Sequence, residues 1–116
     1  MFQIITIADF ITLPQLKQMA ETQFGSLVKA VVDIEKNIMA VGGEMQADEE
    51  AHLISEGSKQ ENLWGINIYP TRPEKTWIEF DSMINIRPSF GNRSRGVDSV
   101  EMQEKIKNIV NAWIEK

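Results

Sequence analysis

The sequence contains no cysteine. This absence excludes a disulfide-stabilised scaffold, thiol catalysis and thiolate metal sites, and it is typical of proteins in a reducing compartment. Histidine occurs once, as His52, so a zinc site would depend on carboxylate ligands. The chain has no Walker-type loop and no Gly-x-Gly-x-x-Gly fingerprint, so neither of these two classes of nucleotide-binding fold is predicted.

Long apolar runs are missing as well. The apolar stretch at residues 2–7 is short and interrupted, and no basic segment precedes it. We therefore expect no signal peptide, no membrane span and a cytoplasmic location. The net charge of −5 and a pI near 4.9 argue against general binding to double-stranded DNA.

The composition itself is that of an ordinary globular protein. The chain has 116 residues, of which 42% are hydrophobic and 25% charged, and it shows no repeat and no low-complexity stretch. A chain of this length buries roughly two thirds of its unfolded surface. We expect one globular domain spanning residues 1–116.

The first half of the chain predicts a strand, a helix and a β-hairpin. Residues 2–7 favour a short strand, and Thr12 with Gln15 forms a capping box that starts a helix ending near Gly25. Residues 28–35 alternate strictly between apolar and polar positions, which is typical of a half-buried strand. A two-residue turn at residues 36–37 then predicts an antiparallel return over residues 38–44.

The second half repeats this pattern with longer strands. A helix is predicted over residues 47–56, followed by strands at 63–69 and 76–87 joined by the turn at 70–75. Asp98 and Glu101 make a second capping box, which opens the C-terminal helix.

The resulting order is β-α-β-β-α-β-β-α. It predicts an α+β fold: an antiparallel-rich mixed sheet of four to five strands, with about three helices packed on one face. The other face of the sheet would then be exposed to solvent.

Three of the four arginines lie in one short segment that has no carboxylate between Asp81 and Asp98. Guanidinium groups match the geometry of phosphate and carboxylate, so the segment predicts a site for a small anionic ligand or a phosphate group. The predicted ligand-binding residues are Arg87, Arg93, Arg95, Asn85 and Asn92. The alternative is that these arginines form ion pairs with the protein's own carboxylates.

Polar residues on the predicted solvent-exposed face of the sheet are the second candidate. They are Asp33, Glu44, Asn67, Glu79, Asp81 and Asn85. Carboxylates on neighbouring strands suit a divalent cation such as magnesium, and we predict that Glu79, Asp81 and Glu44 hold it. The alternative is an ordinary solvated sheet face.

Two aromatic residues are candidates for contacts with a partner. Trp77 falls on the polar face of its predicted strand, where it would be an exposed anchor. Phe90 lies at a loop tip, where it would either stack on a base or pack locally. Trp64 alternates with Ile66 and Ile68 and is expected in the core.

Several blocks of the sequence together resemble a known family. They are Ala30-Val-Val-Asp-Ile-Glu35, Met39-Ala-Val-Gly-Gly-Glu44, Ala47-Asp48, Gly57-Ser-Lys-Gln60, Leu63-Trp-Gly-Ile-Asn-Ile-Tyr-Pro70, Ile78-Glu-Phe-Asp81, and Ile84-Asn-Ile-Arg-Pro88 with Asn92. This resembles a small bacterial family, common in cyanobacteria, that is known only as a domain of unknown function. The resemblance implies a single-domain cytoplasmic protein of bacterial origin. It implies no activity, cofactor or catalytic residue.

Two functions follow from these patterns. The first is an anion- or phosphate-binding domain, extended by the carboxylates to a metal-assisted phosphoesterase or nuclease. The alternative is a non-catalytic interaction module, a small homodimer or a partner-binding domain, which uses the exposed sheet face. A convergent pocket of arginine and carboxylate groups would favour the first, and a flat patch with apolar anchors would favour the second.

Overall fold

The computed structural model describes residues 3–8 and 10–116, so residue 2 of the first predicted strand lies outside it. Its helices are α1 (Leu13–Gln23), α2 (Gln46–Ser55) and α3 (Val100–Trp113), with short 3-10 helices η1 (Gln60–Asn62), η2 (Glu74–Thr76), η3 (Met83–Asn85) and η4 (Pro88–Phe90). Its strands are β1 (Ile5–Ile7), β2 (Ile11–Thr12), β3 (Val28–Asp33), β4 (Ile38–Val41), β5 (Leu63–Ile68), β6 (Ile78–Glu79) and β7 (Ile114–Glu115).

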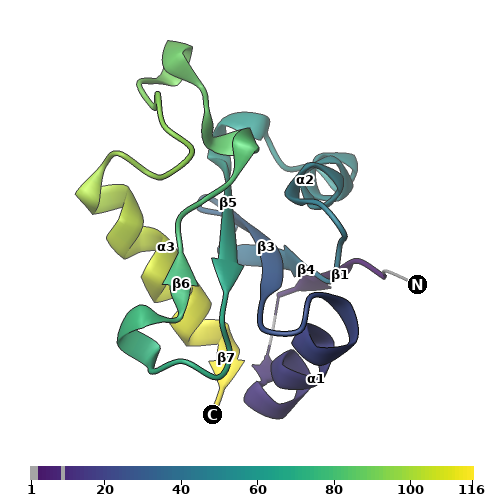
Figure 1. The fold of residues 1–116 in the computed structure, drawn as a ribbon. Helices are drawn as coiled ribbons and strands as arrows, with labels where there is room; N and C mark the ends of the chain where they lie inside the picture. Colours follow the sequence, from purple (N-terminus) through teal and green to yellow (C-terminus); the bar gives the residue numbers. More distant parts are fainter. Residues whose placement is uncertain (1–2, 9) are drawn as a thin grey trace.

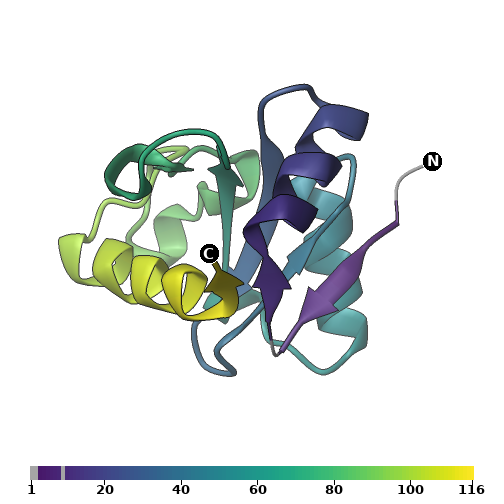
Figure 2. The same cartoon turned by 90° about the horizontal axis from the view of Figure 1, so that it is seen from below.

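Five strands form one antiparallel sheet in the order β1-β4-β3-β5-β6 (Figure 1). The other two pair in parallel, with Ile11 opposite Ile114. Figure 2 shows this small pair between α1 and the end of α3. The α+β class is therefore confirmed. None of the three helices, in the part of the chain that is described, is long and apolar enough to cross a membrane.

The predicted start of the first helix is confirmed. The Gln15 backbone N donates to Thr12 Oγ1 at 3.2 Å, and the Thr12 backbone N donates to Gln15 Oε1 at 2.8 Å. These bonds satisfy donors that the first turn of a helix leaves unpaired. Helix α1 ends at Gln23 with Phe24 as its C-cap, and Gly25 follows with a positive φ of 88°.

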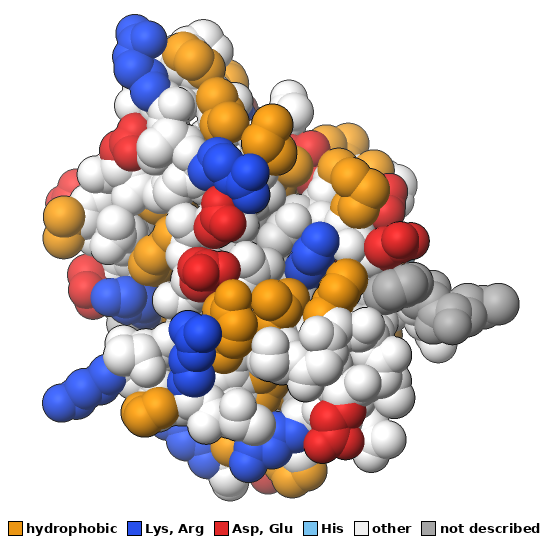
Figure 3. Space-filling model, viewed as in Figure 1, with side chains coloured by type: hydrophobic (Ala, Val, Ile, Leu, Met, Phe, Trp, Pro, Cys, Tyr) orange, Lys and Arg blue, Asp and Glu red, His pale blue; other side chains and the backbone are white. Residues whose placement is uncertain are grey.

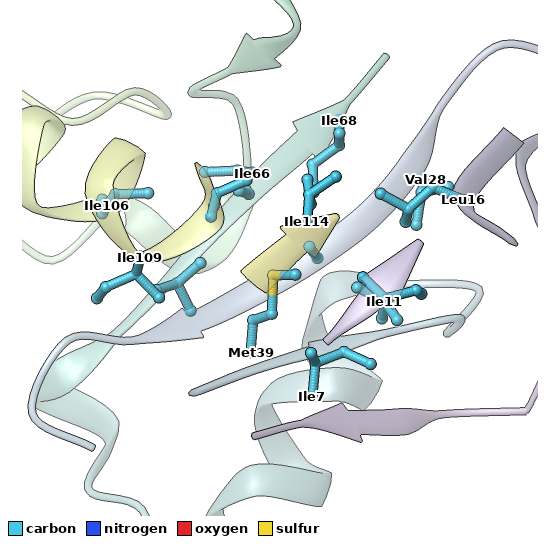
Figure 4. Close-up of a cluster of buried hydrophobic side chains, with 14 of the residues drawn as sticks. Ile7, Ile11, Leu16, Val28, Met39, Ile66, Ile68, Ile106, Ile109 and Ile114 are labelled. Carbon is cyan, nitrogen blue, oxygen red and sulfur yellow. The ribbon is translucent and has the colours of Figure 1, made fainter. Parts of the chain in front are cut away.

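The prediction that all helices lie on one face of the sheet is wrong. The main core includes Val28, Ala30 and Val32 of β3 and residues of α1 and α3, and Figure 4 shows part of it. On the opposite face Val31 packs with Leu53 of α2 in a second buried cluster. The run Ala30-Val31-Val32 is completely buried, as expected for a strand covered on both faces.

The register of the first hairpin also differs from the prediction. Asp33 pairs with Ile38 and Val32 with Met39, so the turn has four residues, 34–37. Buried Asp33 causes this, because its Oδ1 accepts from the backbone N of both Glu35 and Lys36 at 2.9 Å. The register shifts by two residues, so each side chain keeps its face.

The strand predicted over residues 76–87 is only two residues long. After Glu79 the chain leaves the sheet and forms η3 and η4. Trp77 is 2% exposed, and its Nε1 donates to Asn111 Oδ1 at 3.3 Å, so the prediction of an exposed anchor is wrong. Helix α3 is capped by Ser99 rather than Asp98.

Candidate functional site

Arg87 lies inside the protein, on the backbone at the start of β5. Its side chain donates to the carbonyl oxygens of Gln60 and Leu63, and the guanidinium carbon lies 4.5 Å from the centre of the Trp64 ring. Burial lowers the pKa of Arg87, and the nearby Glu50 carboxylate acts in the opposite direction. The guanidinium group of Arg87 is thus bound within the protein and does not lie in an open loop.

The other two arginines lie apart from Arg87. The Arg95 Nε donates to Asp81 Oδ1 at 2.6 Å, so the alternative of an internal ion pair is confirmed for this residue. The Arg93 side chain is exposed and forms no ion pair with any residue the structure describes, while its backbone N donates to Asp98 Oδ2 at 2.9 Å.

The two predicted asparagines are buried and hold the loop together. Asn85 Oδ1 accepts from the Gly65 backbone N at 2.8 Å, and its Nδ2 donates to the carbonyls of Gly65 and Arg95, both at 2.9 Å. Asn92 Nδ2 donates to the Asn85 carbonyl at 2.7 Å, and its Oδ1 accepts from the Asp98 backbone N at 2.8 Å. Their polar atoms are used inside the fold, and they position Arg95.

The carboxylates of the predicted metal site do not gather. Glu79 Oε1 accepts from Asn67 Nδ2 at 2.8 Å and from the Tyr69 hydroxyl at 3.1 Å, whereas Asp81 pairs with Arg95 and Glu44 is exposed. Within residues 3–8 and 10–116, no group of three histidine or carboxylate side chains is arranged to hold a metal ion. In the described part of the chain, Glu44, Glu79 and Asp81 therefore do not form a group that could hold the predicted magnesium ion.

A cleft of about 190 Å³ lies between the start of α2 and the start of η3. Its lining residues are Lys29, Met45, Gln46, Ala47, Ser82, Met83, Ile84 and Arg95. Gly65 lets η3 come this close to the sheet, because a Cβ atom there would lie 2.5 Å from Ser82 Oγ. Two cationic residues thus line the cleft: Lys29 of β3, whose Nζ lies 4.8 Å from the centre of the Phe24 ring, and Arg95 of the loop before α3.

Larger grooves run along α3, but the two largest have side chains of both charges in their lining. One of about 460 Å³ has Lys75 and Lys107 together with Glu74 and Glu104 in its lining, so charges of both signs are mixed. Another of about 500 Å³ has the same mixture. The smaller cleft at α2 is the stronger candidate, because its two charged lining residues are both cationic.

Hydrogen-bond donors at the cleft are available. Ser82 is 2% exposed; its Oγ accepts from the Ile84 backbone N at 3.4 Å and donates to no described residue. Met45 is the N-cap of α2 and provides no side-chain hydrogen bond to the first turn. The first backbone N–H groups of a helix and its dipole both favour an anion at this end.

Beside this helix end lies a carboxyl group that is buried completely. Glu49 Oε2 accepts from the Gly43 backbone N at 3.0 Å, and no described residue contacts its other oxygen with a hydrogen bond. Burial raises the pKa of Glu49 to about 9. The group is therefore uncharged at pH 7, and the other acidic residue of the first turn of α2 is the exposed Asp48.

Sequence reasoning missed Lys29 and Ser82 as site residues. The alternation of residues 28–35 does place Lys29 on the face that α2 covers. The cleft itself was hidden, because Ser82 and Met83 fall within a predicted strand that the chain does not form.

The chain belongs to the family described as "Protein of unknown function (DUF5674)", whose sequence model matches residues 4–113. The match spans nearly the whole chain and confirms the resemblance to a family of unknown function. Searches of curated proteins and of solved structures gave no match.

Proposed function

We propose that this protein binds a small anion in the cleft between α2 and η3. The observation that carries the proposal is that Lys29, Arg95 and Ser82 line one cleft together with the first turn of α2. The Arg95 side chain is 54% exposed and therefore accessible to a ligand, which it can bind through charge-assisted hydrogen bonds.

We also propose that the protein is bacterial and cytoplasmic. The family resemblance supports a bacterial origin, and the lack of cysteine supports a reducing compartment. The proposal does not extend to metal-assisted hydrolysis of phosphoesters, because Glu44, Glu79 and Asp81 do not form a metal-binding group. General binding to double-stranded DNA is not expected at a net charge of −5.

The first prediction compares two neighbouring arginines. We expect Arg95→Ala to weaken the binding of phosphate, sulfate or acetate by about ten- to a hundredfold, because it removes a charge-assisted hydrogen bond. Arg93→Ala is the matched control, since Arg93 is exposed and does not line the cleft. The measurement is the rise in melting temperature with anion concentration at low ionic strength.

Arg95→Ala removes a cation and also leaves Asp81 without its ion-pair partner, so a second variant is needed to separate the two effects. Lys29→Met leaves the ion pair between Arg95 and Asp81 intact and should weaken anion binding to a similar degree. Equal anion-induced stabilisation of the wild type and both cleft variants would contradict the proposal. So would a loss of binding in Arg93→Ala alone.

An interaction module remains the second candidate function, although Trp77 is not its anchor. Exposed apolar side chains gather after β6: Met83 is 65%, Ile86 38% and Phe90 61% exposed. On the face drawn in Figure 3, a row of hydrophobic side chains reaches toward the tip of this segment, close to cationic groups. Such exposed apolar anchors are typical of a protein-binding surface.

The second prediction concerns a homodimer formed through this apolar segment. If the segment pairs two copies of the chain, light scattering should detect a concentration-dependent dimer, and Phe90→Ser should shift it to monomer. Ile54→Ser, which alters an exposed apolar residue of α2, is the control. A wild type that stays monomeric over the whole concentration range would contradict a homodimer.

A further inference from the structure

We propose that the preferred ligand of the cleft is an aliphatic carboxylate, such as the free carboxyl end of a peptide with an apolar last side chain. This inference rests on the proposed anion site and specifies its ligand. The charge, the hydrogen-bond geometry and the apolar lining of the cleft each favour such a ligand over phosphate.

The charge of the cleft suits a monoanion. Lys29 and Arg95 contribute two positive charges, and the Asp81 carboxylate paired with Arg95 cancels one of them. One net positive charge matches a carboxylate, whereas a phosphate monoester carries about −1.5 to −2 at pH 7. The second phosphate charge would therefore lie beside Asp81 without a cation to balance it.

The donors of the cleft also suit a carboxylate. Arg95 binds Asp81 through Nε, and its two terminal nitrogens form no hydrogen bond with a described residue. A guanidinium group can bind a carboxylate through two parallel N–H···O bonds. Ser82 also lines the cleft, and its buried hydroxyl donates to no described residue.

Half of the lining is apolar, and an inorganic anion makes no use of it. Met45, Ala47, Met83 and Ile84 lie beside the cationic groups. A volume of about 190 Å³ corresponds to roughly six water molecules, which is room for a carboxylate together with a short aliphatic group. Burial of that group against the two methionines adds affinity, since methionine adapts to differently shaped partners.

The experiment is a calorimetric titration of the full chain with five probes: acetate, 4-methylpentanoate, inorganic phosphate, dimethyl phosphate, and the peptide acetyl-Gly-Gly-Leu. We expect 4-methylpentanoate to bind at least tenfold more tightly than acetate or phosphate, because each buried methylene adds about fourfold. The peptide with a free carboxyl end should bind, and the same peptide with an amidated end should not.

Variants of the apolar lining provide the matched test. Met83→Gln should reduce the advantage of 4-methylpentanoate over acetate, while Ile54→Gln, an exposed residue outside the cleft, should keep it. Both positions are exposed, so neither change removes core packing.

The titrations distinguish a wrong ligand class from the absence of an anion site. If phosphate or dimethyl phosphate binds more tightly than 4-methylpentanoate, or if chain length has no effect, this inference is overturned and the anion site stands. If none of the four small anions binds, the proposed function itself is overturned. Equal binding of the free and amidated peptides would overturn recognition of a chain end.

Discussion

Between pH 5 and pH 8 the free energy of unfolding is expected to fall by about 4 kcal/mol because of Glu49 alone, and Glu49→Gln should remove that fall. Glu49 is completely buried, with its Cγ packed on Gly43, where a Cβ atom would come within 2.7 Å. Its only hydrogen bond to a described residue comes from the Gly43 backbone N. A charged carboxylate is poorly tolerated there.

The direction of this effect follows from proton binding. The unfolded chain releases the Glu49 proton near the ordinary value of 4.5, whereas the folded protein keeps it up to a pKa of about 9. Between these values the folded state holds one more proton than the unfolded state. The contribution to stability is therefore fully present below pH 4.5 and is lost as the pH rises toward 9.

Urea denaturation at pH 5, 6, 7 and 8 measures this dependence. Glutamine cannot ionise, so the stability of Glu49→Gln should change less with pH than that of the wild type by about 4 kcal/mol over this range. Glu44→Gln, which alters an exposed residue just before α2, is the control and should follow the wild type. Parallel curves for the wild type and Glu49→Gln would show that the folded protein accommodates a charged Glu49.

Asn85→Ala is expected to destabilise the protein by about 3 kcal/mol, because it removes the side-chain partner of the buried Gly65 N–H and carbonyl, whereas the Arg95 carbonyl still accepts from the Ser82 backbone N at 2.9 Å. Asn85 is completely buried and binds both the N–H and the carbonyl of Gly65 in the middle of β5, together with the Arg95 carbonyl. No other side chain of the described residues forms a hydrogen bond with these three groups. The same substitution should also weaken anion binding, since it frees the backbone that carries Arg95.

Chemical denaturation of Asn85→Ala measures the loss, and Asn108→Ala on the exposed side of α3 is the matched control. The control should remain within about 0.5 kcal/mol of the wild type. A loss below about 1 kcal/mol for Asn85→Ala would mean that the Gly65 groups reach other partners, and that Asn85 does not hold the loop.

Local rules of helix and strand formation predicted most of the elements. The capping box of Thr12 and Gln15 forms as expected, and the predicted strands at 28–35 and 63–69 correspond to β3 and β5. Both rely on interactions between residues close in sequence. The strand predicted over residues 76–87 failed, because the Asn85 side chain, and not the backbone of a neighbouring strand, bonds the Gly65 N–H and carbonyl of β5.

The candidate site was only partly predictable for the same reason. The concentration of arginines pointed to the segment that contains Arg95, but the sequence alone does not reveal that Arg87 turns inward to the carbonyls of Gln60 and Leu63. Lys29 lies more than sixty residues away from Arg95 in the sequence. Only the packing of α2 and η3 against the same face of the sheet brings the two together.

The most direct test of the proposed anion site is a titration of the nitrogen-15-labelled protein with acetate, followed by amide chemical shifts in NMR spectra. If acetate binds in the cleft, the amide signals of Gln46, Ala47 and Ser82 should show large saturable chemical-shift changes, and those of Lys29 and Arg95 smaller ones. Saturable shifts confined to the loop around Arg93, or shifts that grow without saturation across the whole surface, would contradict the proposed site.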